Sequence, residues 1–598
     1  APRQSNLMTI WKHRPTAYYL LLSLCLVPAV LIALLISKYG VDMIDWDQWE
    51  VASFFIKYSQ GRLTAADLFS QQAEYRQFFP NLIFVVLGYL TQWNIKVEMF
   101  ASFFVICLIA LTLYRLASLS FSEKRWTNAL LMLLTILILF APAQFESLLL
   151  GEQIIYFIPA ACITTCLCVG YSQLSSNTKL IICFLLSIFS TFSSANGIIC
   201  WLVIPPVLFH SGWKNWRVAV WLLGLLSSAT VYFYSFQKPS YTPDAWAVLH
   251  NPLQGLFFFC ALLGAPLMAS NKLILISTAL GAVLLALFLL SFFYVWKFSD
   301  DQQFKSRAIG WLMLGSYSFL TAIMVTVGRL GAGKYQALAS RYISFSLYLL
   351  IALVYLIPLI TDQALKRGKR PTLKVLKPLL ASAVILLIVI HLFNSAAAIR
   401  QTAWMKIRRL EQKACLLFIN VAPNQCINDG FREFATVSSR VNAINELGFL
   451  RPKLIRSNNI KEIADTNSML DSSSGRFENL GETSDRFIAS GWAGLPGNIE
   501  PADAVLLTYQ KDNADPIIFA YVQMKIAQPS FQRLLVPHPD VDWRWQTSIS
   551  IDGVGVALPI SVSAWAFDAT TGKAYKLGGT YVIEGNGKTP QLVAVGAR

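Results

Sequence analysis

The chain has 598 residues, of which 55% are hydrophobic and only 14% are charged, and its formal net charge is +16. A soluble globular protein carries about 25% charged residues, and a disordered chain does not carry 17 Trp, 22 Tyr and 39 Phe. Ten Cys over this length also exclude a disulfide-rich secreted scaffold. The composition therefore predicts a polytopic α-helical membrane protein with an attached soluble domain.

Eleven apolar runs in the first 395 residues are candidates to cross about 30 Å of hydrocarbon. They lie at 17–39, 96–118, 127–142, 153–172, 179–194, 197–210, 218–235, 273–296, 308–329, 343–361 and 378–395. A turn signal at 193–197 divides the stretch 179–210 into a tight hairpin, and both halves are short enough to be re-entrant. The apolar segment 253–270 is expected to lie as a helix in the outer interface rather than to cross.

The distribution of charge supports this topology. With a cytoplasmic N-terminus, the inner segments of the first 399 residues have a net charge of +14 and the outer segments are neutral. This asymmetry is what the positive-inside rule predicts, so the basic excess does not require a nucleic-acid partner. The first apolar run exceeds 20 residues and lacks a small-residue cleavage site, which favours a signal anchor over a cleaved signal peptide.

Residues 398–598 are expected to form a separate domain, placed outside the cytoplasm by the topology. From residue 490 onward, short alternating runs separated by turn residues predict a β-sandwich-like fold. These runs lie at 504–509, 517–526, 545–551, 557–569 and 580–585. The only two cysteines of this domain, Cys415 and Cys426, are candidates for a disulfide in an oxidising compartment. Its tryptophans either stack on sugars or pack in the core; they are Trp492, Trp543, Trp545 and Trp565.

Several cofactor motifs are absent from the sequence. It contains no Walker A pattern and no GxGxxG, and its five His are scattered singly. No cofactor is therefore expected, and a divalent metal has no support in the sequence.

The first outer loop, 39–95, is far longer than a simple turn and is rich in acids and aromatic residues. Apolar residues recur at helical spacing over 47–58 and again after Phe69, which predicts two amphipathic helices on the outer membrane surface. Asp45 and Asp47 are expected just above the membrane, where a partly desolvated carboxylate acts as a base. The alternative is that such acids only mark the outer side or begin helices, and Asp42 and Asp67 are assigned to that role.

Short motifs in this loop and beyond it resemble a known family. The loop contains Trp46-Asp47-Gln48-Trp49, followed by Glu74-Tyr75-Arg76 and Pro80. These segments are similar to the Trp-Asp-x-Trp and Glu-His-Arg motifs of bacterial multi-span proteins that belong to the GT-C superfamily of membrane glycosyltransferases. The second motif differs in having Tyr75 in place of the His. The resemblance extends to the segments 194–197 and 340–342 and touches most of residues 1–395.

This resemblance implies an inverting transferase that moves a sugar from a polyprenyl-phosphate donor to a glycan or lipid acceptor on the outer face of a bacterial inner membrane. It implies Asp47 as the general base, with Asp45 as second choice, and Glu74 in positioning the acceptor or sugar. The anionic leaving group requires cations at the outer surface. The candidates are Arg76, Arg329, Lys334 and Arg341, with Tyr342 beside the last, and the alternative for the arginines and lysine is interfacial snorkelling.

Two further loops are expected near the substrate. The loop 236–252 carries Lys238, Asp244 and His250, and with the helix at 253–270 it is a candidate cap for a cleft. Glu146 and Glu152 are candidates to face the same cleft. Other functional classes that remain open are a polysaccharide polymerase or ligase, a lipid or glycan flippase, and a non-enzymatic scaffold. An inverted repeat or a charge pair in mid-membrane would favour transport.

Overall fold

A computed structural model of the chain describes a defined set of residues, to which every structural statement below refers. These are residues 15–121, 124–209, 214–240, 242–244, 246–298, 300–367, 370–422, 434–465, 475–483, 486–497, 500–524, 543–550, 558–584 and 591–593. Contacts divide the chain into two compact units. The first comprises Ala1–Gly40, Leu63–Leu87 and Lys96–Ile399, and the second comprises Val41–Arg62, Gly88–Ile95 and Arg400–Arg598.

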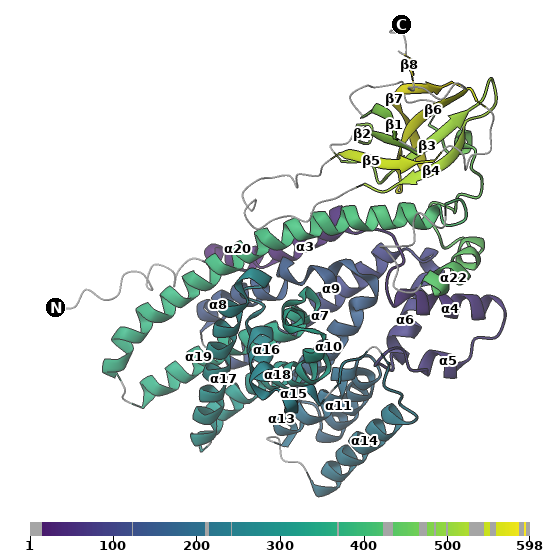
Figure 1. Cartoon of the computed structure of the whole chain (residues 1–598). Coiled ribbons are helices and arrows are strands. Elements are labelled where there is room, and N and C mark those ends of the chain that lie inside the picture. The colour runs from purple at the N-terminus through teal and green to yellow at the C-terminus, as the bar shows by residue number, and fades with distance from the viewer. Residues whose placement is uncertain are drawn as a thin grey trace. The chain divides into compact units, whose positions relative to one another are not determined.

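The first unit is helical (Figure 1). Its α-helices are α2 (Pro15–Leu24), α3 (Leu26–Tyr39), α5 (Ala65–Phe69), α6 (Phe78–Thr91), α7 (Ile95–Ser120), α8 (Arg125–Leu139), α9 (Phe145–Leu149), α10 (Ile154–Gly170), α11 (Ser176–Thr191), α12 (Cys200–Val203), α13 (Pro205–Phe209), α14 (Asn215–Phe233), α15 (Ala247–His250), α16 (Pro252–Gly264), α17 (Ile274–Lys297), α18 (Gln302–Arg329), α19 (Ser340–Lys366) and the first part of α20 (Arg370–Leu417). Short 3-10 turns connect several of them: η1 (Pro142–Gln144), η2 (Gly151–Gln153), η3 (Ala195–Ile199), η4 (Asn271–Leu273), η5 (Leu330–Ala332) and η6 (Lys334–Leu338).

Within the described residues, nine helical segments are long and apolar enough to cross a membrane. They coincide with nine of the eleven expected runs, so the prediction of a multi-pass membrane protein is confirmed at this level. The other two expected crossings, 179–194 and 197–210, correspond to shorter apolar helices at Ser176–Thr191 and Ala195–Phe209. At about 1.5 Å per residue, helices of this length reach about 24 Å or less, which is shorter than a typical hydrocarbon core.

Several polar groups inside the helical bundle are paired with one another. The Trp311 ring of α18 stacks on Tyr355 of α19, with ring centroids 3.7 Å apart. The Tyr355 hydroxyl lies 3.0 Å from the hydroxyl of Thr135 on α8, and the Trp311 indole donates to Ser120 on α7 at 2.9 Å. Because an unpaired polar group in apolar surroundings costs several kcal/mol, about 2–7 on transfer scales, these contacts specify which helices are neighbours.

The segment 253–270, expected to lie in the outer interface, contains helix α16, whose C-terminal half is buried within the first unit. Three of its residues, Phe258, Ala261 and Leu263, are fully buried. Two glycines allow this close packing: a Cβ at Gly264 would lie 1.9 Å from the Ser277 carbonyl oxygen, and one at Gly281 would lie 1.8 Å from the Cys260 carbonyl oxygen. The backbones of α16 and α17 therefore touch, as small residues permit at helix interfaces in membranes.

The second unit contains parts of the first outer loop together with the C-terminal chain. Its helices are α4 (Gln48–Ser59), the end of α20 and α22 (Phe434–Glu446), with a 3-10 turn η7 (Ile460–Glu462). Phe55 of α4 is completely buried, with its ring centroid 4.9 Å from that of Phe449 and 4.6 Å from that of Trp93. The expected domain boundary at 397/398 lies inside the continuous helix α20, and the expected first domain included loop segments that this second unit contains.

The predicted β-rich domain is present (Figure 1). Its strands are β1 (Gly475–Thr483), β2 (Arg486–Ala493), β3 (Ala504–Gln510), β4 (Ile517–Val522), β5 (Arg544–Ile549), β6 (Ile560–Asp568), β7 (Lys573–Ile583) and β8 (Gln591–Val593). Two antiparallel ladders, β4-β3-β6-β7-β8 and β1-β2-β5, are joined by one parallel pair, Arg476 with Gly578. The two strands before residue 490 were not predicted.

Both ladders bury side chains in one core. The Phe477 ring of β1 lies with its centroid 5.5 Å from Trp545 of β5 and 4.7 Å from Tyr581 of β7. Trp545 is therefore a core residue, one of the two roles considered for the tryptophans of this domain, and only 2% of its surface is exposed.

Substituting Gly281 with Ala should destabilise the helical unit, because the new Cβ would meet main-chain atoms that cannot rotate away. We expect a loss of about 3 kcal/mol, measured as a lower midpoint of thermal unfolding of the detergent-purified protein. Gly328→Ala on α18 is the matched control, since a Cβ there meets nothing within 4 Å and Ala favours helix by about 1 kcal/mol. Equal midpoints for Gly281→Ala and wild type would contradict the role of this backbone contact.

Asp503, just before β3, should make the stability of the protein depend on pH. Burial raises the pKa of its carboxyl to about 8, and the hydrogen bond that it accepts from the Ala569 N–H offsets only part of this. Because the folded state holds the proton more tightly than the unfolded chain, stability falls as the pH rises from about 4 to about 8, by up to about 1.4 kcal/mol per pH unit.

The expected result is an unfolding midpoint that drops between about pH 5 and pH 8 in the wild type and drops less in Asp503→Asn, which cannot ionise. Differential scanning fluorimetry of the full chain measures both. Glu482→Gln, at an exposed acid of β1, is the control and should follow the wild type. Parallel curves for Asp503→Asn and wild type would show that this carboxyl is already ionised at low pH.

Candidate functional site

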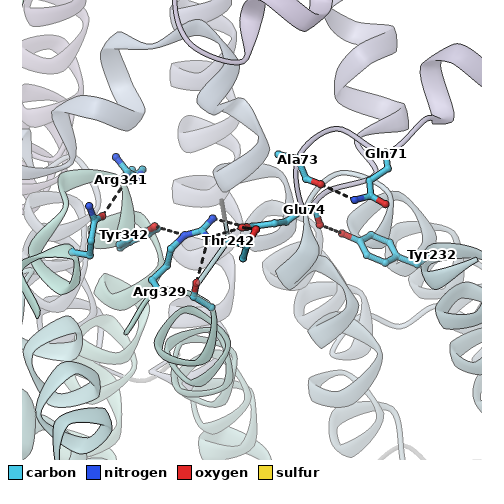
Figure 2. A network of polar contacts seen from close by, with 10 residues as sticks. Gln71, Ala73, Glu74, Tyr232, Thr242, Arg329, Arg341 and Tyr342 are labelled. Carbon is cyan, nitrogen blue, oxygen red and sulfur yellow. Dashed lines mark hydrogen bonds and ion pairs between the residues drawn. The ribbon is translucent and has the colours of Figure 1, made fainter. Parts of the chain in front are cut away.

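Polar side chains of the first unit gather where several of its helices end (Figure 2). The contributing parts are the loop before α6, the loop after α14, the end of α18 and the start of α19. The connection from α18 to α19 consists of the two short turns η5 and η6, with Gly333 at φ +102° between them. Charged residues are expensive inside apolar helices, which is why they are found at such ends.

Glu74 and Arg329 form the centre of this group. The Arg329 guanidinium binds both carboxylate oxygens of Glu74, with a Nη1–Oε1 distance of 2.6 Å. Its Nε donates to the Tyr342 hydroxyl at 3.1 Å, and the Thr242 hydroxyl donates to Oε1 of Glu74 at 3.1 Å. Figure 2 shows Arg329 between Tyr342 and Glu74. The bidentate geometry fixes the plane of the guanidinium relative to that of the carboxylate. These contacts therefore hold together the first-loop motif, the loop after α14, the end of α18 and the start of α19.

Arg341 makes a second ion pair at the start of α19. Both its main-chain N–H and its Nη1 donate to Oε2 of Glu146, at 3.1 and 3.4 Å, and its Nη2 donates to Gln336 at 3.3 Å. The neighbouring Ser340 hydroxyl donates to the Ala143 carbonyl at 2.7 Å. The side chains of Arg341 and Glu146 are 20% and 23% exposed, so this pair is as enclosed as the pair of Arg329 and Glu74.

Tyr75 occupies the position of the His in the motif. Burial raises the pKa of its hydroxyl above the ordinary value for a phenol, and the positive charge of Arg329 offsets only part of that rise. A phenol with a raised pKa keeps its proton at neutral pH, so Tyr75 is a hydrogen-bond donor rather than a base.

Arg76 was expected to bind substrate phosphate, and the structure gives it main-chain partners instead. Its Nε donates to the Tyr232 carbonyl at 2.7 Å, its Nη1 donates to the Phe69 carbonyl at 3.2 Å, and its Nη2 donates to the Tyr234 carbonyl. Only 8% of the residue is exposed. The guanidinium therefore ties the loop before α6 to the end of α14, and it is a structural residue in this conformation.

A cleft of about 420 Å³ opens beside Lys334. Its lining combines this ammonium group with the amides of Asn251 and Gln254 and the apolar side chains of Phe257 and Leu330. The helix α15 and the start of α16, which belong to the segments expected to cap a cleft, supply one wall. His250, the last residue of α15, is exposed and is not part of the lining.

The loop 236–252 contributes to the group through residues that were not singled out in the sequence. Thr242 binds Glu74, and a Cβ at Gly331 would lie 2.7 Å from Cβ of Pro243, so the loop packs on the η5 turn. Lys238 and Asp244 are exposed, and Asp244 accepts the N–H of Trp246 at 3.1 Å within its own loop.

Glu152 is buried at η2 and accepts from the amide of Gln153 at 3.0 Å. It belongs to the same unit as Glu146, but it is 7% exposed and therefore less accessible to a ligand from solvent.

The acids at the start of the first loop lie in the second unit and have different environments. Asp45 is 8% exposed and forms an ion pair with Arg409, with an Oδ2–Nε distance of 3.3 Å. Asp42 accepts the main-chain N–H of Ile95 at 2.9 Å, at the start of α7. Asp47 is exposed at the start of α4. Of the two candidate bases, Asp47 is therefore accessible to an acceptor and Asp45 is enclosed.

Asp67, in the first unit, was assigned to marking the outer side or beginning a helix, and the structure places it in the first turn of α5. It forms a capping box with Thr64 at the start of α5, each side chain binding the main-chain N–H of the other residue.

The predicted disulfide falls partly outside the described residues. Cys415 is buried near the end of α20, whereas Cys426 is not among the residues that the structure describes. The pairing stays a prediction. Among the described residues, no group of three or more His, Cys, Asp or Glu is arranged to hold a metal ion.

Comparisons with protein-family models, with curated proteins and with solved structures found no match to this chain. Its function is therefore argued from its own residues.

Sequence reasoning found Glu74, Arg329, Arg341, Tyr342 and Glu146, which the structure brings into two linked groups. It did not find their pairing, because Glu74 and Arg329 are 255 residues apart. It also did not find Thr242, Gln336 or the amides of Asn251 and Gln254. The available signal for Gln336 was that it lies in the connection from α18 to α19, close to the three cations at 329, 334 and 341.

Breaking the Glu74–Arg329 pair should destabilise the first unit, because it leaves a largely enclosed charge without its partner. We expect Glu74→Gln and Arg329→Gln each to cost about 2 kcal/mol, and the double variant to cost less than the sum. Thermal unfolding in detergent gives all three values.

The exposed pair of Lys124 and Asp362, whose side chains are 48% and 26% exposed, is the control for this cycle. Lys124→Gln should cost less than about 1 kcal/mol. Additive effects of Glu74→Gln and Arg329→Gln would show that the two side chains do not act as a pair.

Proposed function

We propose that this protein is a membrane glycosyltransferase that moves a sugar from a polyprenyl-phosphate donor to a glycan or lipid acceptor. The observation that carries the proposal is the open cleft lined by Lys334, in the short connection from α18 to α19 whose two ends also hold Arg329 and Arg341 in ion pairs. A phosphate leaving group gains negative charge as the glycosidic bond breaks. Cations held in place by other side chains stabilise that charge without having to reorganise.

The surroundings of Lys334 suit an amphipathic donor. The ammonium and the two amides of the cleft can bind phosphate and sugar hydroxyls, and Phe257 and Leu330 supply apolar surface. On the same helix as the cleft wall, Leu253 and Leu256 are 82% and 55% exposed. Exposed leucines on a helix of an apolar bundle suit contact with lipid chains.

The reaction has a definite proton balance. The acceptor hydroxyl forms a bond to the anomeric carbon, the bond from that carbon to the phosphate oxygen breaks with inversion, and the hydroxyl proton passes to a base. The family resemblance makes Asp47 the candidate base, and its exposure is compatible with that role. Tyr75 is a poor alternative because its raised pKa keeps it protonated.

The proposed setting is the plasma membrane of a bacterium, with the N-terminus inside and the C-terminal domain outside, where both donor and acceptor are available. This orientation follows from the charge asymmetry of the loops. No metal or cofactor is required for the transfer as written.

The test is transfer from a panel of polyprenyl-phosphate sugars in membranes containing the protein. We expect one donor to be used, and Asp47→Asn to lower kcat by a factor of about 100 or more, because removing a general base typically has this effect. Lys334→Gln should raise KM for the donor by about tenfold, since each 1.4 kcal/mol of binding is a factor of ten.

Two exposed residues provide matched controls: Glu482→Gln for the acid and Lys272→Gln for the cation should both leave transfer unchanged. Unaltered transfer by Asp47→Asn would remove Asp47 as the base. A wild-type protein that uses no member of the panel would overturn the proposed function.

A further inference from the structure

The turn that precedes α4 holds a bulky residue in an unusual conformation. Trp46 has φ +46°, a left-handed backbone that residues with large side chains seldom adopt because it brings Cβ close to the carbonyl oxygen. Its side chain gains little burial in return, since Trp46 is 50% exposed. Strained non-glycine residues of this kind concentrate at sites where a side chain must be presented in one direction.

Buried polar contacts fix this turn. Oδ1 of Asp45 accepts the Trp46 N–H at 2.9 Å, and the side chain of Gln48 accepts the Asp45 N–H at 3.1 Å. The other oxygen of Asp45 lies 3.3 Å from Nε of Arg409 on α20. Arg409 and Gln48 are 3% and 2% exposed.

The residues of this turn differ in their exposure to solvent. Trp49 is buried, with 4% of its surface exposed, and its carbonyl accepts from the guanidinium of Arg440. Trp46 and Asp47 face outward, whereas Asp45, Gln48 and Trp49 face the interior of the second unit. An aromatic ring and a carboxylate are thus presented side by side on the surface.

This pair matches the chemistry of a sugar. A pyranose ring has apolar C–H faces that pack on an indole, and hydroxyls that donate to a carboxylate. Burying an ion pair behind the turn does not stabilise the fold more than apolar side chains would. The buried ion pair of Asp45 and Arg409 therefore suits a role in holding the turn in one fixed geometry.

We propose that Trp46 and Asp47 form a binding element for the acceptor sugar, and that Arg409 is a positioning residue which holds this element through Asp45. The proposal rests on the proposed function, because it takes the acceptor of the transferred sugar as the ligand. It also makes the C-terminal part of α20 a determinant of acceptor binding.

The positioning role is tested by hydrogen–deuterium exchange of the full chain in detergent. In Arg409→Gln the amides over 45–50, which are bonded within the turn, should exchange about tenfold faster than in the wild type, while those of β3 should not change. Lys406→Gln is the matched control, because Lys406 lies three residues earlier on α20 and pairs with Glu500 rather than with the turn. Unchanged exchange over 45–50 in Arg409→Gln would overturn the positioning role.

If Arg409→Gln does not fold, Asp45→Asn and the double variant with Arg409→Gln serve the same purpose. Asp45→Asn keeps an oxygen for the Trp46 N–H but removes the charge, and the double variant leaves no unpaired charge. The double variant should fold for that reason, and whichever variant folds should show faster exchange over 45–50.

The sugar-binding role is tested without any transfer reaction. Binding of a panel of short hexose and N-acetylhexosamine oligosaccharides to the detergent-purified protein is measured by native mass spectrometry. We expect Trp46→Ala to weaken binding about tenfold, Trp46→Phe to retain most of it because a ring remains, and Arg409→Gln to weaken it as well. Trp216→Ala, at a tryptophan that is 49% exposed on α14, should bind as the wild type does.

Wild-type affinity in Trp46→Ala, or no oligosaccharide bound by the wild type, would overturn the binding role. Loss of vesicle partitioning by Trp46→Ala with sugar binding intact would also overturn it, because the ring would then be a membrane anchor. Sugar binding that depends on Trp46 in a protein that transfers no sugar would refute the proposed function and the assignment of this sugar as an acceptor, and would leave only the sugar-binding role of Trp46 and Asp47 standing.

Discussion

Enclosed charges in an apolar helical unit need polar partners, and the rest of the structure depends on this constraint. The first unit has few ionisable side chains, and at the ends of α18 and α19 they are matched one to one, Glu74 with Arg329 and Glu146 with Arg341. Each pair joins segments that are far apart in the chain, so electrostatics determines which loops meet. The same contacts set the connection from α18 to α19, and with it one wall of the cleft at Lys334.

In the second unit, which contains the β-rich domain, side chains of the first loop are likewise paired with distant parts of the chain. Segments of the first loop supply Asp45, Glu50 and Phe55, whose partners Arg409, Arg440 and Phe449 all come from the C-terminal chain. The C-terminal domain is therefore not an independent appendage. Separated from residues 41–62, it would expose the apolar surface around Phe449 and leave the Arg409 guanidinium buried without its carboxylate.

The sequence predicted the class of protein and the identity of many charged residues, but not their partners. Apolar runs located the long helices because hydrophobicity alone determines them. Asp67 was assigned only to the general role of acids in an outer loop, although the capping box that it forms with Thr64 is a local feature of four residues. Pairings over hundreds of residues, such as Glu74 with Arg329, leave no local pattern. For the same reason the sequence ranked Asp47 before Asp45 only through the family resemblance, and it did not show that a partner on α20 encloses Asp45 whereas Asp47 is exposed.

The contact between α16 and α17 limits how this protein can vary. When an enlarged residue collides with a neighbouring side chain, a second substitution that shrinks the neighbour can restore the fit. At Gly264 and Gly281 the obstacles are the main-chain atoms of Ser277 and Cys260, which no substitution removes. A loss of function at either glycine therefore has no direct suppressor at its point of contact. Revertants should arise at the same codon, or at distant sites that raise the stability of the whole unit.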